Sequence, residues 1–203
     1  MKVASKYSHL HGEEFMIVHK QPLLEEIYEV IGSVDAARFM TKVSEEKTKR
    51  GALLYSPAEI NGEFKRIFEA RGWKSVRRDF FVSADYATVK VLETLPFEQQ
   101  RKYLLEHDQP LMPSYNQTDF VKEEVAIEVQ MGKYFAVTYD LFVKHLSFYN
   151  GGIIDVGIEI VPGKALQRQM SSGVPFFEKE VHNMLRHGRT TPPVPIIVLG
   201  VDP

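Results

Sequence analysis

The chain has 203 residues, 44% of them hydrophobic and 26% charged, a composition typical of one globular domain with a large core. It contains no cysteine, which excludes disulfides and thiolate metal sites and fits a reducing cytoplasm. Its net charge of −2 excludes a polycation, so any binding of nucleic acid has to rely on a local basic cleft.

The N-terminal third predicts mainly helices separated by polar segments. Phe15, Ile17 and His19 alternate with other residues and favour a strand. Ser56-Pro57 is a typical helix start, because Ser caps the first turn and Pro fits the first helical position. The predicted elements are a strand over residues 13–20, a helix over 22–33, a loop over 41–51 and a helix over 56–71.

The next segment predicts a strand around Phe80-Phe81-Val82, a charged amphipathic helix over residues 96–107, and a loop over 108–114 that contains two prolines. No apolar run approaches the length of a membrane span, and Met1 to Ser5 lack the apolar core of a signal peptide. We therefore expect a cytoplasmic protein that neither spans nor binds a membrane.

A stretch in the middle of the chain concentrates polar groups beside a strand. Apolar residues alternate with others over 125–130, which is the period of a β-strand and puts Glu128 and Gln130 on one face. The polar segment 122–124 predicts a turn, so Asp119 is expected to fold back beside Glu128 as the other arm of a hairpin.

Two carboxylates held together in this way repel each other unless a cation lies between them. Oxygen ligands suit a hard divalent ion, and Mg²⁺ is the ion that we expect. The pattern of Asp119, Glu128 and Gln130 therefore predicts a metal-dependent phosphodiesterase site. The alternative interpretation is a solvated hairpin with ordinary surface acids, since so short a motif also occurs by chance.

After the hairpin the apolar period changes from 2 to 3.6, which indicates a helix. His145 in this helix is interpreted as a core or interface residue, and the alternative is a catalytic role. Strands alternating with helices predict an α/β fold with a central mixed β-sheet flanked by helices. No linker or repeat interrupts the chain, so residues 1–203 are expected to form a single domain. The predicted C-terminal elements are a helix over 134–149, a strand over 153–161, a short helix over 163–170, a helix over 175–188 and a strand over 194–201.

Several segments follow one another in the order of a known nuclease family: Leu54-Tyr55-Ser56-Pro57 with Asn61, Trp73-Lys74, Gln117-Thr118-Asp119-Phe120, Glu128-Val129-Gln130 with Tyr134, Ser171-Ser172 and Phe176-Phe177-Glu178. With them the chain resembles the type II restriction endonucleases of the BglII and BstYI kind, within the PD-(D/E)xK nuclease superfamily. The similarity runs from Tyr7 to the C-terminus and implies the restriction-endonuclease fold and DNA cleavage.

The resemblance implies roles for the hairpin residues. Asp119 and Glu128 would bind Mg²⁺, with the Val129 carbonyl, waters and a phosphate oxygen completing an octahedral shell. Most relatives in the superfamily have Lys where this chain has Gln130. An amide cannot accept a proton at neutral pH, so Gln130 is expected to orient a water or a metal ligand. The general base stays unassigned, between the metal-bound water and a substrate phosphate.

Sequence specificity requires contacts to bases as well as to phosphates. Lys133 lies in the strand-to-helix turn beyond the hairpin, where we expect it to project into the groove beside the cut bond. The resemblance places Ser171, Ser172 and nearby Arg168 against the bases, although a helix cap and turn also explains the two serines. Asn116 is a further candidate for DNA binding.

Together with these features, the resemblance implies a type II restriction endonuclease that cuts double-stranded DNA at a short palindrome with a GATC core. We expect a homodimer, because a two-fold site matches a two-fold protein. The Lys133 ammonium only donates, and both purines offer N7, so we expect a purine-GATC-pyrimidine site. A cognate DNA methyltransferase is the expected partner in the same restriction-modification system. The alternatives are another nuclease of the superfamily, acting in repair or on DNA structures, and a DNA-binding protein that has lost catalysis.

Overall fold

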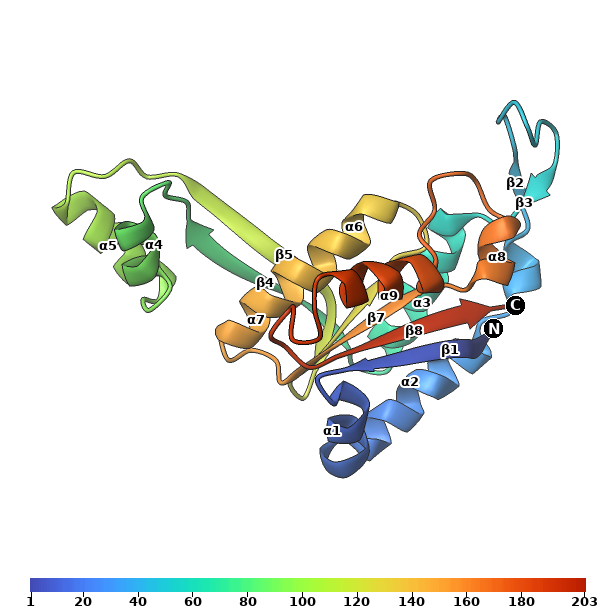
Figure 1. The fold of residues 1–203 in the computed structure, drawn as a ribbon, viewed down its shortest axis with the longest axis horizontal. Coiled ribbons are helices and arrows are strands. Elements are labelled where there is room, and N and C mark those ends of the chain that lie inside the picture. The colour runs from blue at the N-terminus through green and yellow to red at the C-terminus, as the bar shows by residue number, and fades with distance from the viewer. The chain divides into compact units, whose positions relative to one another are not determined.

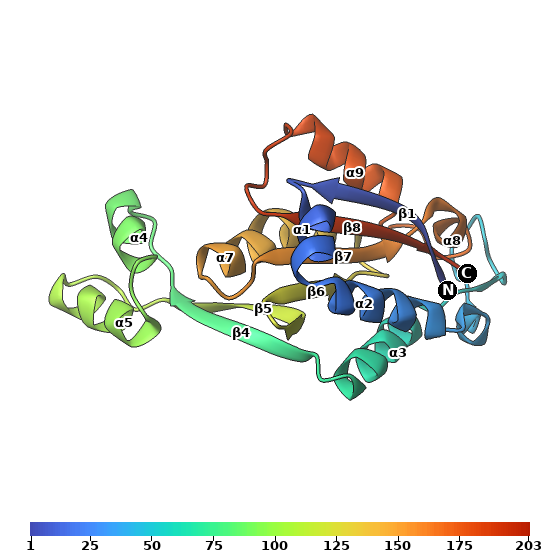
Figure 2. The same cartoon turned by 90° about the horizontal axis from the view of Figure 1, so that it is seen from below.

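The computed structural model describes residues 1–203, shown from two sides in Figure 1 and Figure 2. The chain divides into two compact units, one of residues 1–75 with 118–203 and one of residues 76–117. The elements in chain order are β1 (Lys2–His9), α1 (Gly12–His19), α2 (Gln21–Ser33), η1 (Ala36–Phe39), β2 (Lys42–Val43), β3 (Leu53–Leu54), α3 (Pro57–Ala70), β4 (Lys74–Phe81), α4 (Tyr86–Leu92), α5 (Phe97–Glu106), β5 (Pro113–Lys122), β6 (Val125–Val129), α6 (Tyr134–Tyr139), η2 (Asp140–Lys144), α7 (His145–Asn150), β7 (Val156–Pro162), α8 (Lys164–Arg168), α9 (Phe177–Arg186) and β8 (Ile196–Asp202).

A six-stranded mixed sheet has the order β1-β8-β7-β6-β5-β4. Strands β6, β7 and β8 run parallel, whereas β1 is antiparallel to β8 and β5 is antiparallel to β6. Every residue of β6 and β7 is buried, as expected for parallel strands that are covered on both faces. The α/β fold predicted from the sequence is therefore confirmed.

The larger unit has an apolar layer on each face of the sheet. On one face, α2 and α3 pack over Ile127, Ile158 and Ile197 of the three parallel strands. On the other face, α6, η2 and α9 pack over residues that include Val161 and Val198. Figure 2 shows α2 and α3 on one side of the sheet and α9 on the other. Alternation along each strand thus decides which layer a side chain enters.

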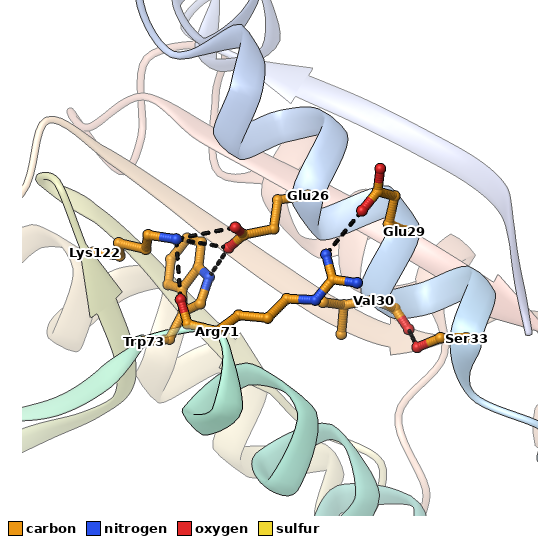
Figure 3. A network of polar contacts seen from close by, with 7 residues as sticks. All are labelled: Glu26, Glu29, Val30, Ser33, Arg71, Trp73 and Lys122. Atoms are coloured by element: carbon orange, nitrogen blue, oxygen red, sulfur yellow. Dashed lines mark hydrogen bonds and ion pairs between the residues drawn. The ribbon is translucent and has the colours of Figure 1, made fainter.

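A polar network fixes the end of the β5–β6 hairpin to the helical layer (Figure 3). The Lys122 ammonium lies 3.0 Å from both carboxylate oxygens of Glu26 on α2, and it donates to the Arg71 carbonyl at 3.1 Å. The Trp73 indole also donates to Glu26, and the Arg71 guanidinium pairs with Glu29 at 2.8 Å. These contacts join α2, the end of α3 and the hairpin.

The smaller unit has a core of its own. Phe81, Leu92 and Leu104 are buried together. The buried Gln100 side chain accepts a hydrogen bond from the Phe81 amide at 3.0 Å and donates to the Leu92 carbonyl at 3.0 Å. The helix predicted over residues 96–107 is confirmed as α5, and α4 is an additional helix that the sequence pattern did not predict.

The strand predicted over residues 13–20 is wrong, because Gly12–His19 forms helix α1. Its start packs against β8 so closely that a Cβ on Gly12 would lie 2.8 Å from backbone atoms of Ile196. Only Gly12 and Met16 of this helix are buried, and their i, i+4 spacing is helical. The apparent alternation of Phe15, Ile17 and His19 therefore reflects side chains that do not share a buried face. The true first strand, β1, lies earlier.

Candidate active site

The central hairpin has the geometry that the sequence predicted. Phe120 pairs with Ile127 and Lys122 with Val125 in antiparallel register. Glu123 and Glu124 form the two-residue turn with positive φ values of 46° and 58°, the backbone that tight hairpins require. Continuing the register by one pair places Asp119 opposite Glu128.

Strand alternation directs the acids to the face of the sheet that α6, η2 and α9 cover. Ile127 and Val129 enter the apolar layer of α2 and α3, so Glu128 between them faces the opposite way. Glu128 is 2% exposed, whereas Asp119 is exposed. The Asp119 carboxylate accepts a hydrogen bond from the Val129 amide at 3.2 Å, which ties the two arms of the hairpin at the site.

A partly buried lysine lies among the acids. The Lys144 ammonium is 2.8 Å from Glu128 Oε2 and 2.8 Å from Asp140 Oδ1. Burial, followed by the charge of Asp119, raises the pKa of Glu128 well above its ordinary value. Burial alone would lower the pKa of Lys144, but Glu128 and Asp140 raise it above its ordinary value, so the ammonium stays charged. The site therefore combines several acids with one partly buried cation.

The donor atoms fit a hard divalent cation. Glu128 Oε1 is buried and has no hydrogen-bond partner, an arrangement that costs free energy unless a cation or a donor reaches it. Asp119 adds an exposed carboxylate, and every available donor is oxygen. No cluster of three or more His, Cys, Asp or Glu side chains forms a metal cage, so two carboxylates would act with backbone and water oxygens. A cavity of about 200 Å³ is lined by Asn61, Gly62, Lys65, Asp119, Phe120 and Val129.

Gln130 is held by contacts on both sides of its amide. Its Oε1 accepts the Lys133 backbone N–H at 3.2 Å, and its side chain hydrogen-bonds Asp140. The next residue, Met131, donates its backbone N–H to the Asn61 side chain at 3.3 Å. An amide fixed in this way has a defined orientation, which is the property that a water-orienting group requires.

A second acid, Glu159, lies one strand further into the sheet, where it pairs in register with Glu128. It is fully buried and neither oxygen has a hydrogen-bond partner, although Oε2 lies 3.5 Å from His145 Nε2. Burial, then the charge of Asp140, raises the pKa of Glu159 well above its ordinary value. Burial, with the charge of Lys144, lowers the pKa of His145 to about 3. His145 is therefore neutral at neutral pH, and burial favours the protonated, neutral form of Glu159. His145 is 1% exposed, so its interpretation as a core residue is confirmed.

Glu159→Gln is expected to stabilise the protein at alkaline pH. An unfolded Glu loses its proton near a pKa of about 4.3, whereas the folded protein retains it to a higher pH, so wild-type stability falls as the pH rises between those values. The variant avoids this loss, which amounts to about 1.4 kcal/mol for each pH unit in that interval. Urea unfolding at roughly pH 4 and pH 8 measures it. A stability difference that is the same at both pH values would contradict the buried neutral acid.

Two of the predicted DNA-binding segments lie together. The Tyr134 amide, next to the exposed Lys133, donates to the Gly173 carbonyl at 3.1 Å, which joins the strand-to-helix turn to the loop of Ser171 and Ser172. Ser172 is exposed, and its amide and hydroxyl donate hydrogen bonds to Glu46 Oε1 at 2.6 and 3.0 Å.

The other two predicted DNA contacts, Arg168 and Asn116, differ in exposure. Arg168 is exposed at the end of α8. Asn116 is 5% exposed and belongs to the smaller unit. The segment of Arg168 is tied to the loop over residues 41–51, because the Lys49 ammonium donates to the carbonyls of Arg168 and Met170 at 3.0 and 2.8 Å.

The sequence pattern did not predict Asp140, Lys144 and Glu159 as members of the site. The only signal for the first two was their i, i+4 spacing of opposite charges, which usually marks an exposed helix face. Here η2 is a π-helical turn, and both side chains point into the protein. Glu159 was hidden inside an apolar strand, because nothing in the sequence shows which strand lies beside Glu128.

The comparisons with known proteins concern the family and the fold of the chain. The family model described as restriction endonuclease BglII/BglIII matches residues 4–201. The crystal structure of BglII complexed with a DNA 16-mer has a TM-score of 0.66 and 18% identity, covering 98% of this chain and 78% of that one. Free BglII has a TM-score of 0.56 and 15% identity, with 98% and 79% covered. No curated protein sequence matches the chain significantly.

The family model spans nearly the whole chain, and the fold agrees with it independently. Members of such a family depend on a divalent metal and act on double-stranded DNA. None of the helices has the length and apolar character needed to cross a membrane. The chain belongs to the BglII/BglIII restriction endonuclease family and is a type II site-specific deoxyribonuclease.

Proposed function

We propose that the protein, acting as one endonuclease domain over residues 1–203, makes Mg²⁺-dependent double-strand cuts at a purine-GATC-pyrimidine palindrome. The observation that carries the proposal is the hairpin pair of Asp119 and Glu128, with a buried carboxylate oxygen that lacks a partner. A cognate DNA methyltransferase in the same system would protect the host's own sites.

The residues of the hairpin have two roles, metal binding and orientation of the reacting water. The carboxylates of Asp119 and Glu128 and the carbonyl of Val129 would hold Mg²⁺, and all three are hard oxygen ligands. When bound, the ion neutralises charge on the phosphate and lowers the pKa of a coordinated water. Gln130 orients the reacting water through its amide, whose position is fixed by Lys133 and Asp140.

Base recognition is assigned to the surface where the turn at Lys133 meets the loop of Ser171 and Ser172, with Arg168 and Asn116 as further DNA contacts. The exposure of Ser172 supports this assignment, because its amide and hydroxyl both donate to Glu46 Oε1 and could instead donate to the acceptors that base edges carry. DNA would replace the Glu46 carboxylate as the acceptor.

Lys133→Asn is expected to shift the outer-base preference toward adenine. Lysine donates to N7, which both purines share, whereas asparagine offers the acceptor and donor that match adenine N6 and N7. The gain for AGATCT over GGATCC should reach about 1–3 kcal/mol if the contact is bidentate. Rates of cleavage of AGATCT, GGATCC and the mixed site by wild type and variant give the comparison.

The competing role for Lys133 is a phosphate contact. In that case the variant would lose activity equally at all three sites and its binding would depend less steeply on salt. A uniform loss would therefore remove Lys133 from base recognition and leave the outer-base preference unexplained.

We also propose a homodimer, because a palindromic site calls for two-fold symmetry. Phe135, Tyr139 and Val143 follow one another at intervals of four along α6 and η2 and are 62%, 46% and 41% exposed. Such a stripe of large apolar side chains is suited to a second copy of the chain.

Phe135→Glu is expected to convert the dimer to a monomer by placing a charge in this stripe. Sedimentation velocity should show roughly half the mass, and double-strand cleavage should fall because each copy supplies one active site. Lys90→Glu on α4 changes a cation in the smaller unit and serves as a charge control. An unchanged dimer in Phe135→Glu would place the interface elsewhere.

A further inference from the structure

The π-helical turn η2 brings an ion pair to the hairpin from another element. Asp140 and Lys144 begin and end this turn, and their side chains are only 4% and 14% exposed. Wide π-helical turns inside α-helices are frequent at functional sites, since they redirect side chains that a regular helix would place elsewhere. Here the turn delivers an ammonium that lies 2.8 Å from Glu128.

The ammonium distinguishes the two oxygens of Glu128. Oε2 is 2.8 Å from Lys144, whereas Oε1 is buried without any hydrogen-bond partner. A carboxylate that is free to rotate about its last bond would exchange these oxygens. The contact with Lys144 selects one orientation and leaves Oε1 as the oxygen available to a further ligand.

Asp140 extends the contact to Gln130. Its Oδ1 lies 2.8 Å from Lys144, and its carboxylate also receives a hydrogen bond from the Gln130 side chain. The pair therefore touches both Glu128 and Gln130, the two hairpin residues that alternation places on the same face as η2.

We propose that Lys144 and Asp140 are positioning residues of the cleavage site: Lys144 holds Glu128 by Oε2 so that Oε1 is presented to the divalent ion, and Asp140 holds Lys144 and Gln130 in register. The proposal rests on the assignment of Glu128 as a metal ligand. Groups that orient metal ligands in this way change metal affinity or activity about 10–100-fold when they are replaced.

The competing explanation is a salt bridge that only stabilises the fold, and the chain offers a matched control for it. Lys122 is also partly buried and contacts the Glu26 carboxylate and the Arg71 carbonyl, in the network of Figure 3. Lys122→Met removes a comparable ion pair from a network that contains none of the proposed site residues. It is expected to lower thermal stability and to leave metal binding unchanged.

The experiment measures Mn²⁺ binding to the DNA-free protein by electron paramagnetic resonance, together with single-turnover cleavage at saturating Mg²⁺. Lys144→Met should weaken Mn²⁺ binding and slow cleavage about 10–100-fold. Lys144→Arg, which keeps the charge and the donors, should recover most of both. Asp140→Asn should also slow cleavage about 10–100-fold. If Lys144→Met fails to fold, the result for Asp140→Asn tests the positioning role of the pair.

The direction of the Mn²⁺ result separates positioning from simple charge. Removing a cation that merely occupied the site would tighten Mn²⁺ binding, and a purely structural pair would leave it at the wild-type value. Either outcome would overturn the proposal. Mn²⁺ binding by Glu128→Gln is measured alongside. If that variant binds Mn²⁺ like wild type, the assignment of the metal site itself is wrong. If Glu128→Gln loses Mn²⁺ binding while Lys144→Met binds Mn²⁺ normally, only the role of Lys144 is overturned.

Discussion

Asp119→Asn and Glu128→Gln are each expected to abolish cleavage while leaving specific DNA binding intact. Each change removes a charged oxygen ligand from the proposed metal site and alters the shape of the side chain very little. A loss of at least about 10³-fold in the single-turnover rate corresponds to about 4 kcal/mol of lost transition-state stabilisation. Cleavage of a labelled duplex with one site measures the rate, and fluorescence anisotropy without metal measures binding.

Metal-free binding provides the internal control for these two variants. A carboxylate that faces a phosphate repels it when no metal ion is bound, so the neutral variants should bind the site as tightly as wild type or more tightly. If either variant cuts at close to the wild-type rate with Mg²⁺, the proposed site is wrong. If either variant loses binding as well as cleavage, its effect is on the fold.

Gln130→Ala should slow cleavage strongly, by about 10²-fold, because the reacting water loses the group that orients it. The pH dependence of the rate should keep its shape, since an amide does not titrate. The structure supports a geometric role, because contacts with Lys133 and Asp140 hold the amide in place. Single-turnover rates from about pH 6 to pH 9 make the measurement.

Gln130→Glu complements the alanine variant, because it keeps the size of the side chain and adds a carboxylate next to Asp140. It should change the preference among Mg²⁺, Mn²⁺ and Ca²⁺ and introduce a titrating group into the pH profile. An unchanged rate in Gln130→Ala would reduce the residue to a structural role, and a shifted profile in that variant would contradict the idea that Gln130 carries no proton.

The sequence predicted the parts of the fold that follow from local patterns. The β5–β6 hairpin was predictable because its alternation is regular and its turn is polar, and α3 because Ser56-Pro57 is a clear start. Helix α1 was not predictable, because a segment of eight residues with two buried positions fits the strand period of 2 as well as the helix period of 3.6. Strand β1 was missed because it lies at the edge of the sheet and carries few apolar residues.

The candidate site was predictable only where its residues are neighbours in sequence. Asp119 and Glu128 come together through one hairpin, so strand period and turn position place them on the same face. Lys144 reaches Glu128 only through the packing of η2 on the sheet, and Glu159 only through the pairing of β6 with β7. These contacts depend on tertiary structure, which a local pattern does not encode.

The most direct test of the central claim is digestion of unmodified plasmid DNA of known sequence with Mg²⁺, followed by sequencing of the ends. The proposal predicts discrete fragments whose ends all fall within purine-GATC-pyrimidine sites, and no cutting by Glu128→Gln. Cuts at an unrelated sequence, nicks confined to junctions or mismatches, or equal cutting by the variant would contradict it.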